Sequence, residues 1–274
     1  MTGRPVVQLR ERLIFAMGGG GFTMEPANPL LDDFVLSLAD VAMPRILFLP
    51  TASGDTTAQI NAFKDRFAER ACVPEQLSLF HLRDATRPLA EVVLGQDIIY
   101  VGGGSMRNLL ALWRAHGLDS LLVHAWQRGT VLAGLSAGAM CWFEGGVTRS
   151  SGPPEPIDGL GLLEGSLTVH ADGEPERLPV WLACVCNGTL PGGWALDDGV
   201  GLLFRGRSVE RAVSSRPGAG AQRVDAIAGE LVRARLKVEL LGEGPRAALG
   251  GYDAAVEELR RVNRMRRGGS RDRG

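Results

Sequence analysis

Val131-Leu132-Ala133-Gly134-Leu135-Ser136-Ala137-Gly138 is an apolar run that ends abruptly in a serine between two glycines. The pattern Gly-x-Ser-x-Gly between a strand and a helix is typical of a nucleophile elbow, a sharp turn that exposes a serine hydroxyl. Such a turn needs small neighbours, because its backbone dihedrals are unusual and the space is narrow. A serine N-cap on an ordinary strand–helix turn would give the same residues. Both interpretations stay open on these residues alone.

Upstream of this turn, short apolar runs alternate with longer amphipathic ones. Apolar runs predict strands at Leu13–Met17, Arg45–Leu49, Gln76–Leu82, Asp97–Val101 and Thr130–Leu135. Helical spacing predicts helices at Leu30–Leu38, Thr57–Ala71, Arg107–Ala115 and Leu118–Gln127. This rhythm indicates an α/β fold with a doubly wound, mostly parallel sheet and flanking helices. Such sheets carry their chemistry in loops at the carboxyl ends of the strands.

The rhythm changes after about residue 145. Short strand candidates follow at Leu167–His170, Gly201–Phe204 and Val209–Val213. We interpret them as antiparallel edge strands and excursions of the same domain, with a Gly/Ala-rich loop at 216–222. We expect one α/β hydrolase domain over residues 1–266 and a basic, disordered tail over 267–274.

Composition limits the partners. The 274 residues are 45% hydrophobic and 22% charged with a formal net charge of −1, so no broad attraction to nucleic acid or to a membrane surface is expected. Charges interrupt the N-terminal segment, no apolar run approaches a membrane span, and we expect a cytoplasmic protein. No cysteine pair has C-x-x-C spacing, so we expect four reduced thiols and no zinc site. We also expect no other metal and no cofactor. The cysteines are Cys72, Cys141, Cys184 and Cys186.

A serine hydroxyl is a weak nucleophile without a base, and four histidines are available. His170 ends a strand candidate and opens the polar run Ala171–Arg177, from which it could reach Ser136. Of the other three, one ends another strand candidate and two lie in the helices before the elbow, where we interpret them as surface or core residues. The three are His81, His116 and His124.

Two backbone groups are candidate oxyanion donors. The Ala137 N–H follows the serine at a helix N-terminus, where partial positive charge favours an anion. Gly102-Gly103-Gly104 lacks both the P-loop ending and the dinucleotide fingerprint. If it has a function, we expect it to supply the second oxyanion donor; the structural alternative is an ordinary βα turn. We interpret Gly18–Gly21 as structural.

Eight motifs in this order and spacing carry a family resemblance. They are Gly18–Phe22, Pro50–Asp55, Asp97–Gly104, Gly134–Ala139, Cys141–Glu144, Gly159–Leu163, His170–Arg177 and Asp197–Gly199. From about Leu13 to Val213 the chain resembles the peptidase E and cyanophycinase family of serine peptidases, whose fold is similar to flavodoxin-like class I glutamine amidotransferases. The resemblance implies that Ser136 is the nucleophile, that His170 is the base, and that Gly104 and Ala137 form the oxyanion hole.

Three departures lie near the expected site. Relatives carry Thr-Asp-Ser-Phe-Gly where this chain has Thr148-Arg149-Ser150-Ser151-Gly152, an Asn at Ser105, and Pro-His-Tyr-Asp at Val169–Asp172. The acidic residue replaced by Arg149 is a candidate third triad member in relatives. Its possible substitutes here are Glu144, Glu155 and Asp172.

The resemblance implies a serine peptidase that cleaves short peptides, with N-terminal aspartyl dipeptides as one substrate class. Two alternatives are an impaired relative that binds a small amino-acid-like ligand, favoured by Arg149, and a cyanophycinase-like hydrolase. Ser105, Arg149 and Arg177 are substrate-binding candidates, and Arg177 could equally form a structural ion pair. The expected partners are a small peptide substrate and, as an alternative to a monomer, a second copy in a homodimer.

Overall fold

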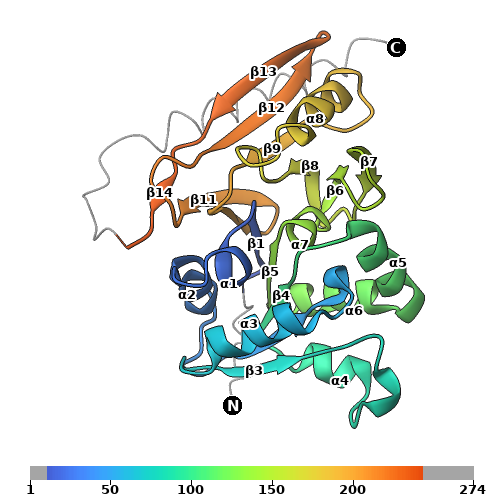
Figure 1. The fold of residues 1–274 in the computed structure, drawn as a ribbon, viewed down its shortest axis with the longest axis vertical. Helices are drawn as coiled ribbons and strands as arrows, with labels where there is room; N and C mark the ends of the chain where they lie inside the picture. Colours follow the sequence, from blue (N-terminus) through green and yellow to red (C-terminus); the bar gives the residue numbers. More distant parts are fainter. Residues whose placement is uncertain (1–10, 243–274) are drawn as a thin grey trace, which may run out of the picture.

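A computed structural model describes residues 11–242 (Figure 1). Its larger sheet has eight strands in the order β14-β11-β10-β1-β5-β4-β2-β3. Five of them form a parallel core, namely β1 (Leu13–Met17), β2 (Arg45–Leu49), β3 (Val73–Gln76), β4 (Ile98–Val101) and β5 (Val131–Leu135). Beyond β1, β10 (Val200–Arg205) and β11 (Ser208–Ser214) run antiparallel, and β14 (Glu239–Leu240) pairs parallel with β11. The predicted mostly parallel α/β sheet is confirmed.

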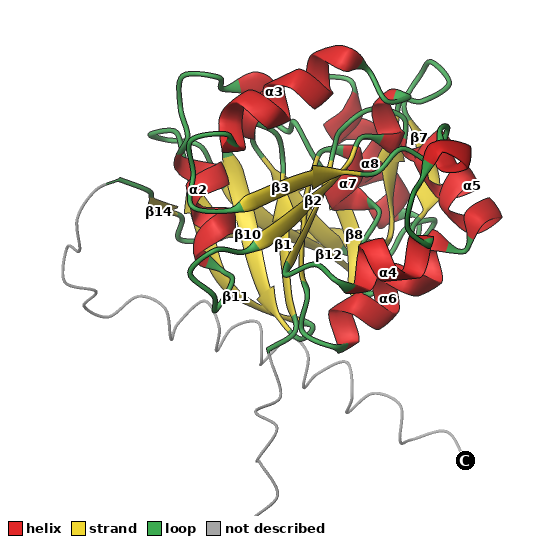
Figure 2. Ribbon diagram, turned by 90° about the horizontal axis from the view of Figure 1, so that it is seen from below, coloured by secondary structure: helices red, strands yellow, loops and turns green. Residues whose placement is uncertain are grey.

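Helices cover both faces of this sheet (Figure 2). One face carries α1 (Gly21–Met24), α2 (Leu30–Ser37) and α3 (Thr57–Phe67). The other carries α4 (Leu89–Leu94), α5 (Met106–His116), α6 (Leu118–Gln127) and α7 (Ala137–Met140). Successive strand residues alternate between the faces, so Phe48 packs with Phe63 of α3 while Leu47 joins the opposite core with Trp113 of α5. Burial on both faces explains the continuous apolar runs of the central strands.

A second sheet of six strands follows in the order β13-β12-β9-β8-β6-β7. Its strands are β6 (Phe143–Thr148), β7 (Glu155–Asp158), β8 (Leu163–Thr168), β9 (Gly193–Leu196), β12 (Ala221–Ile227) and β13 (Glu230–Arg235). One face packs under α8 (Arg177–Cys186) through Trp181 and Val224. The other joins the main core, where Phe143 and Trp194 both contact Phe204 of β10. The two sheets therefore share one apolar core.

Several element predictions were wrong. The predicted strand Gln76–Leu82 is instead β3 at Val73–Gln76. The apolar residues that suggested the later strand, Leu77 and Leu79, lie in the loop after β3 and bury their side chains in the core. β10 and β11 are antiparallel as interpreted, but they lie inside the larger sheet, whose edge on this side is β14. The candidate at Leu167–His170 belongs to β8 of the second sheet. The loop predicted at 216–222 ends where β12 begins. The predicted tail at 267–274 lies outside the described residues.

Candidate active site

Ser136 occupies a sharp turn between β5 and α7. Its backbone has φ 53° and ψ −117°, a conformation that L-residues rarely adopt, and its side chain is half-buried. A Cβ on Gly134 would lie 2.0 Å from the Gly138 carbonyl oxygen, and one on Gly138 would lie 2.5 Å from the Val101 carbonyl oxygen. The two motif glycines therefore let β5, α7 and β4 approach closely enough to form the turn that the sequence pattern predicts.

His170 and Asp198 complete a hydrogen-bonded chain with this serine. His170 Nε2 lies 2.9 Å from Ser136 Oγ, and His170 Nδ1 lies 2.5 Å from Asp198 Oδ1. A carboxylate can only accept, so Nδ1 carries the proton and Nε2 is left to accept from the serine hydroxyl. A serine, an imidazole and an orienting carboxylate in this order are the parts that nucleophilic catalysis requires.

The three residues come from three different connections. Ser136 follows β5 of the larger sheet, His170 follows β8 of the second sheet, and Asp198 lies in the link from β9 to β10, which joins the sheets. Asp172 Oδ1 accepts from the Asp198 N–H across 2.8 Å. The Ala171 N–H donates to the Leu196 carbonyl across 3.0 Å, so the two loops are held together next to the site.

The glycine-rich loop after β1 supports the His–Asp pair by close contact. A Cβ on Gly19 would lie 2.0 Å from Asp198 Oδ1 and 2.8 Å from the His170 ring. The Gly199 N–H also donates to the Gly19 carbonyl across 3.2 Å. This loop therefore shapes the site with its backbone alone, consistent with the structural interpretation of Gly18–Gly21.

The glycine triplet after β4 borders Ser136 from the other side. A Cβ on Gly103 would come within 3.3 Å of Ser136 Cβ, and Gly104 is exposed with φ 140°. Within residues 11–242, neither the Gly104 N–H nor the Ala137 N–H donates to another protein group. Both candidate oxyanion donors thus keep an unused hydrogen, one on the residue after Ser136 and one on the loop whose Gly103 borders the serine.

The model of Peptidase family S51 matches residues 14–212, which is well over half of the chain. The chain belongs to peptidase family S51. It is 48% identical over 229 residues to the uncharacterized peptidase YgaJ of Bacillus subtilis (strain 168), covering 84% of this chain and 99% of that relative. This S51 chain is therefore a peptidase, and the predicted family resemblance is confirmed.

Two solved structures share the S51 chain's fold. A peptidase from an acI-B1 actinobacterium matches with a TM-score of 0.61 at 21% identity, over 86% of this chain and 96% of that one. A putative peptidase E protein from Listeria monocytogenes EGD-e matches with a TM-score of 0.51 at 19% identity, over 83% of this chain and 100% of that one.

None of the three carboxylates that we expected as partners of His170 contacts the imidazole in this S51 peptidase. Glu144 Oε2 accepts from the Gly165 N–H across 2.7 Å, Glu155 pairs with Arg107 at 2.7 Å, and Asp172 holds the Asp198 backbone. Asp198 is the carboxylate that contacts His170. Its sequence signal was the pair Asp197-Asp198 before Gly199, an acidic motif directly after a short apolar run.

The predicted substrate-binding residues lie in different surroundings. Arg149 Nη1 lies 3.7 Å from Glu174 and its Nη2 lies 3.5 Å from Glu176, so it bridges to the loop after His170. Arg177 is buried and pairs with Glu174 at 3.0 Å, and burial lowers the pKa of its guanidinium. Ser105 Oγ accepts from the Asn108 N–H as the N-cap of α5. Arg149 thus contacts the loop that follows His170, and Ser105 directly follows the glycine triplet.

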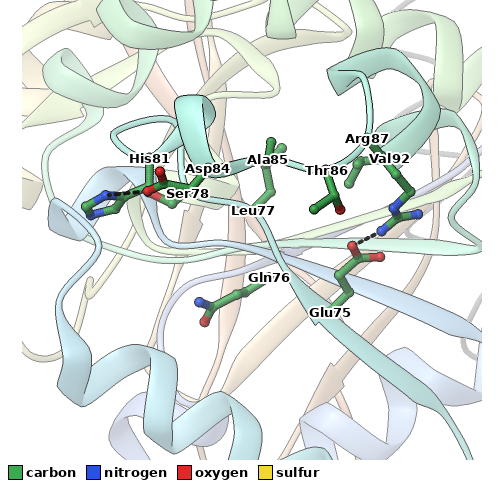
Figure 3. Close-up of a pocket in the computed structure, with 10 residues that line it drawn as sticks. All are labelled: Glu75, Gln76, Leu77, Ser78, His81, Asp84, Ala85, Thr86, Arg87 and Val92. Atoms are coloured by element: carbon green, nitrogen blue, oxygen red, sulfur yellow. Dashed lines mark hydrogen bonds and ion pairs between the residues drawn. The ribbon is translucent and has the colours of Figure 1, made fainter.

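A cavity of about 240 Å³ lies elsewhere, between β3 and α4 (Figure 3). Its lining includes Glu75, which pairs with Arg87, and the exposed His81, 3.8 Å from Asp84. It includes none of the site residues described above. The part of the chain that the structure describes has no cluster of three or more His, Cys, Asp or Glu side chains arranged to hold a metal.

Two other sequence expectations can be compared with residues 11–242. All four cysteines are free thiols; Cys72, Cys141 and Cys184 are buried and Cys186 is exposed. No helix in this part of the chain combines the length and apolarity that a membrane crossing requires.

Proposed function

We propose that this S51 peptidase hydrolyses short peptides with Ser136 as nucleophile, His170 as general base and Asp198 as the residue that orients the imidazole. The observation that carries the proposal is the continuous chain from Ser136 Oγ through His170 to Asp198, at 2.9 and 2.5 Å. Because Asp198 completes this series of hydrogen bonds, the geometry favours a working hydrolase over the impaired, ligand-binding alternative. That alternative rested on the absence of an acidic partner for His170.

Each group has a defined step. Ser136 Oγ attacks the peptide carbonyl carbon while its proton passes to His170 Nε2, and the Gly104 and Ala137 N–H groups stabilise the oxyanion that forms. His170 then returns the proton to the leaving amine, whose C–N bond breaks and leaves an acyl-enzyme. His170 then takes a proton from water as the water attacks the acyl carbon, and it returns that proton to Ser136 Oγ as the ester C–O bond breaks and the acid leaves. Asp198 keeps Nδ1 protonated and stabilises the imidazolium in both halves.

Family resemblance and one surface group support the substrate class. Peptides with an N-terminal aspartate are the class that the resemblance implies, and the half-exposed Arg149 guanidinium, which pairs with the loop after His170, suits a substrate carboxylate. Burial of Arg177 against Glu174 favours its structural role. We retain the cytoplasm as the expected location. A cyanophycinase-like enzyme would use the same three residues on a β-aspartyl-arginine substrate.

Turnover of a matched peptide panel tests this function. The panel contains Asp-Xaa dipeptides, the corresponding Asn-Xaa and Glu-Xaa dipeptides, and β-aspartyl-arginine. We expect wild-type protein to cleave the Asp-Xaa members best and Ser136→Ala to cleave none, with an unchanged melting temperature. Preferred cleavage of β-aspartyl-arginine would instead assign the protein a cyanophycinase-like substrate. Binding of the dipeptides without any cleavage would instead favour the ligand-binding alternative.

A further inference from the structure

The glycine triplet beside Ser136 contacts a side chain that takes no part in the steps above. Gln59, in the first turn of α3, donates from Nε2 to the Gly103 carbonyl across 3.3 Å. Gln59 Oε1 is buried without a hydrogen-bond partner within residues 11–242. A Cβ on Gly102 would lie 2.9 Å from that oxygen, so the glutamine amide packs directly against the triplet backbone.

The hydrogen bond from Gln59 acts on the peptide group that carries a candidate oxyanion donor. The Gly103 carbonyl and the Gly104 N–H belong to one trans peptide, and in a planar trans peptide these two groups point in opposite directions. Holding the carbonyl toward α3 therefore fixes the direction in which the Gly104 N–H points.

This peptide needs an anchor more than its neighbours do. The Gly102 N–H donates to the Leu49 carbonyl and the Ser105 N–H donates to the Ala52 carbonyl, so both ends of the triplet are fixed by backbone contacts. The Gly103–Gly104 peptide lies between two glycines, whose permissive dihedrals restrict its rotation less than other residues would. Within the described residues, Gln59 is the hydrogen-bond partner that opposes this rotation.

We propose that Gln59 is a positioning residue for the oxyanion hole: its amide holds the Gly103–Gly104 peptide so that the Gly104 N–H faces the oxyanion. The inference rests on the proposed function, because an oxyanion forms only if Ser136 attacks a carbonyl. Gln59 itself touches no reacting atom. Its effect falls on the transition state, where charge develops on the oxygen, and not on the bound peptide.

Steady-state kinetics of Gln59→Ala on the best Asp-Xaa dipeptide test this role. We expect kcat to fall about 10- to 100-fold with KM unchanged within about threefold, a smaller loss than the roughly 10²- to 10³-fold that follows removal of an oxyanion donor. Asn61→Ala is the matched control, because this exposed amide lies on the same helix two residues away. It should leave kcat and KM at wild-type values.

Gln59→Glu adds a readout that loss of packing would not produce. An ionised carboxylate cannot donate to the Gly103 carbonyl, whereas a protonated carboxyl can. The ratio of variant to wild-type kcat should therefore rise several-fold as pH falls from 8 to 5, at melting temperatures that show folded protein throughout. The pH dependence of Gln59→Glu tests the positioning role even if Gln59→Ala fails to fold.

The outcomes separate the two proposals. A Gln59→Ala kcat within twofold of wild type, or a ratio of Gln59→Glu to wild-type kcat that does not change with pH, overturns the positioning role. If Ser136→Ala loses turnover in the same assays, the proposed function still holds. Full turnover in Ser136→Ala overturns both.

Discussion

His170 Nδ1 lies 2.5 Å from Asp198 Oδ1, although 28 residues separate them in the chain. The contact forms where the link from β9 to β10 passes from the second sheet to the first, and the adjacent Asp172 fixes the Asp198 backbone. The orientation of the imidazole toward Ser136 therefore depends on the junction of the two sheets.

Asp198→Asn should reduce kcat by about 10⁴-fold while the protein stays folded, because an amide that donates toward Nδ1 selects the wrong imidazole tautomer. Asp197→Asn is the control. That neighbouring carboxylate accepts from the Gly220 N–H across 2.8 Å and should cost less than about tenfold. Steady-state kinetics of both variants decide the assignment, and an Asp198→Asn enzyme with a tenth or more of wild-type kcat would contradict it.

Arg149→Asp should not raise the rate. The guanidinium bridges Glu174 and Glu176 and has no contact with His170, and exposed ion pairs of this kind contribute about 0–1 kcal/mol. We expect kcat to change less than about threefold, with any loss appearing as a higher KM for acidic peptides. A rate increase of tenfold or more would mean that a carboxylate at this position replaces Asp198 as the partner of His170.

Gly19→Ala should abolish most activity without unfolding the protein. The added methyl group would lie 2.0 Å from Asp198 Oδ1, so the carboxylate must move away from His170. Gly220→Ala provides the comparison, because a Cβ there meets only Asp197 Oδ2 at an ordinary 3.5 Å. We expect a kcat loss of about 10²- to 10⁴-fold for the first variant and little for the second. Equal effects of the two would argue against close packing at the His–Asp pair.

Asp32 should make stability depend on pH. Burial raises the pKa of its carboxyl to about 6 from the ordinary 3.8, against the opposing effects of Arg66 and Tyr100. The folded state then binds more protons than the unfolded state between these values, so this group's contribution to stability is present below about pH 4 and is lost as pH rises to 6. Relative to Asp32→Asn, the wild-type free energy of unfolding should fall by up to about 3 kcal/mol over that interval.

Urea denaturation at pH 4, 5, 6 and 7 measures this difference. A wild-type curve parallel to that of Asp32→Asn across all four pH values would show that Asp32 keeps its ordinary pKa. A difference that grows in favour of the wild type as pH rises would mean that Arg66 dominates the buried pair and lowers the pKa.

The central parallel strands were predictable because strands that are buried on both faces consist of consecutive apolar residues. Leu13–Met17 and Arg45–Leu49 appear with the predicted bounds. The edge strand β3 contains Pro74 and Glu75 and has no such run, so the apolar loop that follows it was mistaken for the strand. Much of the second sheet was missed for a similar reason: Gly145, Gly146 and other small or polar residues interrupt the apolar pattern.

The candidate site divides in the same way. Ser136 and His170 were identifiable because a local motif and the end of a strand mark them. Asp198 lies in the acidic motif Asp197–Gly199, but its contact with His170 was not predictable from that motif, because the two residues meet only once β9 and β10 connect the two sheets. Because relatives carry an acidic residue where this chain has Arg149, the sequence predicted a substitute near that position. The three predicted carboxylates lie closer in sequence to the histidine or the serine than Asp198 does.

Active-site labelling tests the account's central claim most directly. Wild-type protein, Ser136→Ala and His170→Ala are incubated with a fluorophosphonate probe, and the modified residue is located by peptide mass spectrometry. We predict one adduct, on Ser136, absent from Ser136→Ala and at least 100-fold slower to form in His170→Ala, since the imidazole activates the hydroxyl. No adduct on the folded wild-type protein, or an adduct that persists in Ser136→Ala, would contradict the assignment of Ser136 as the activated nucleophile.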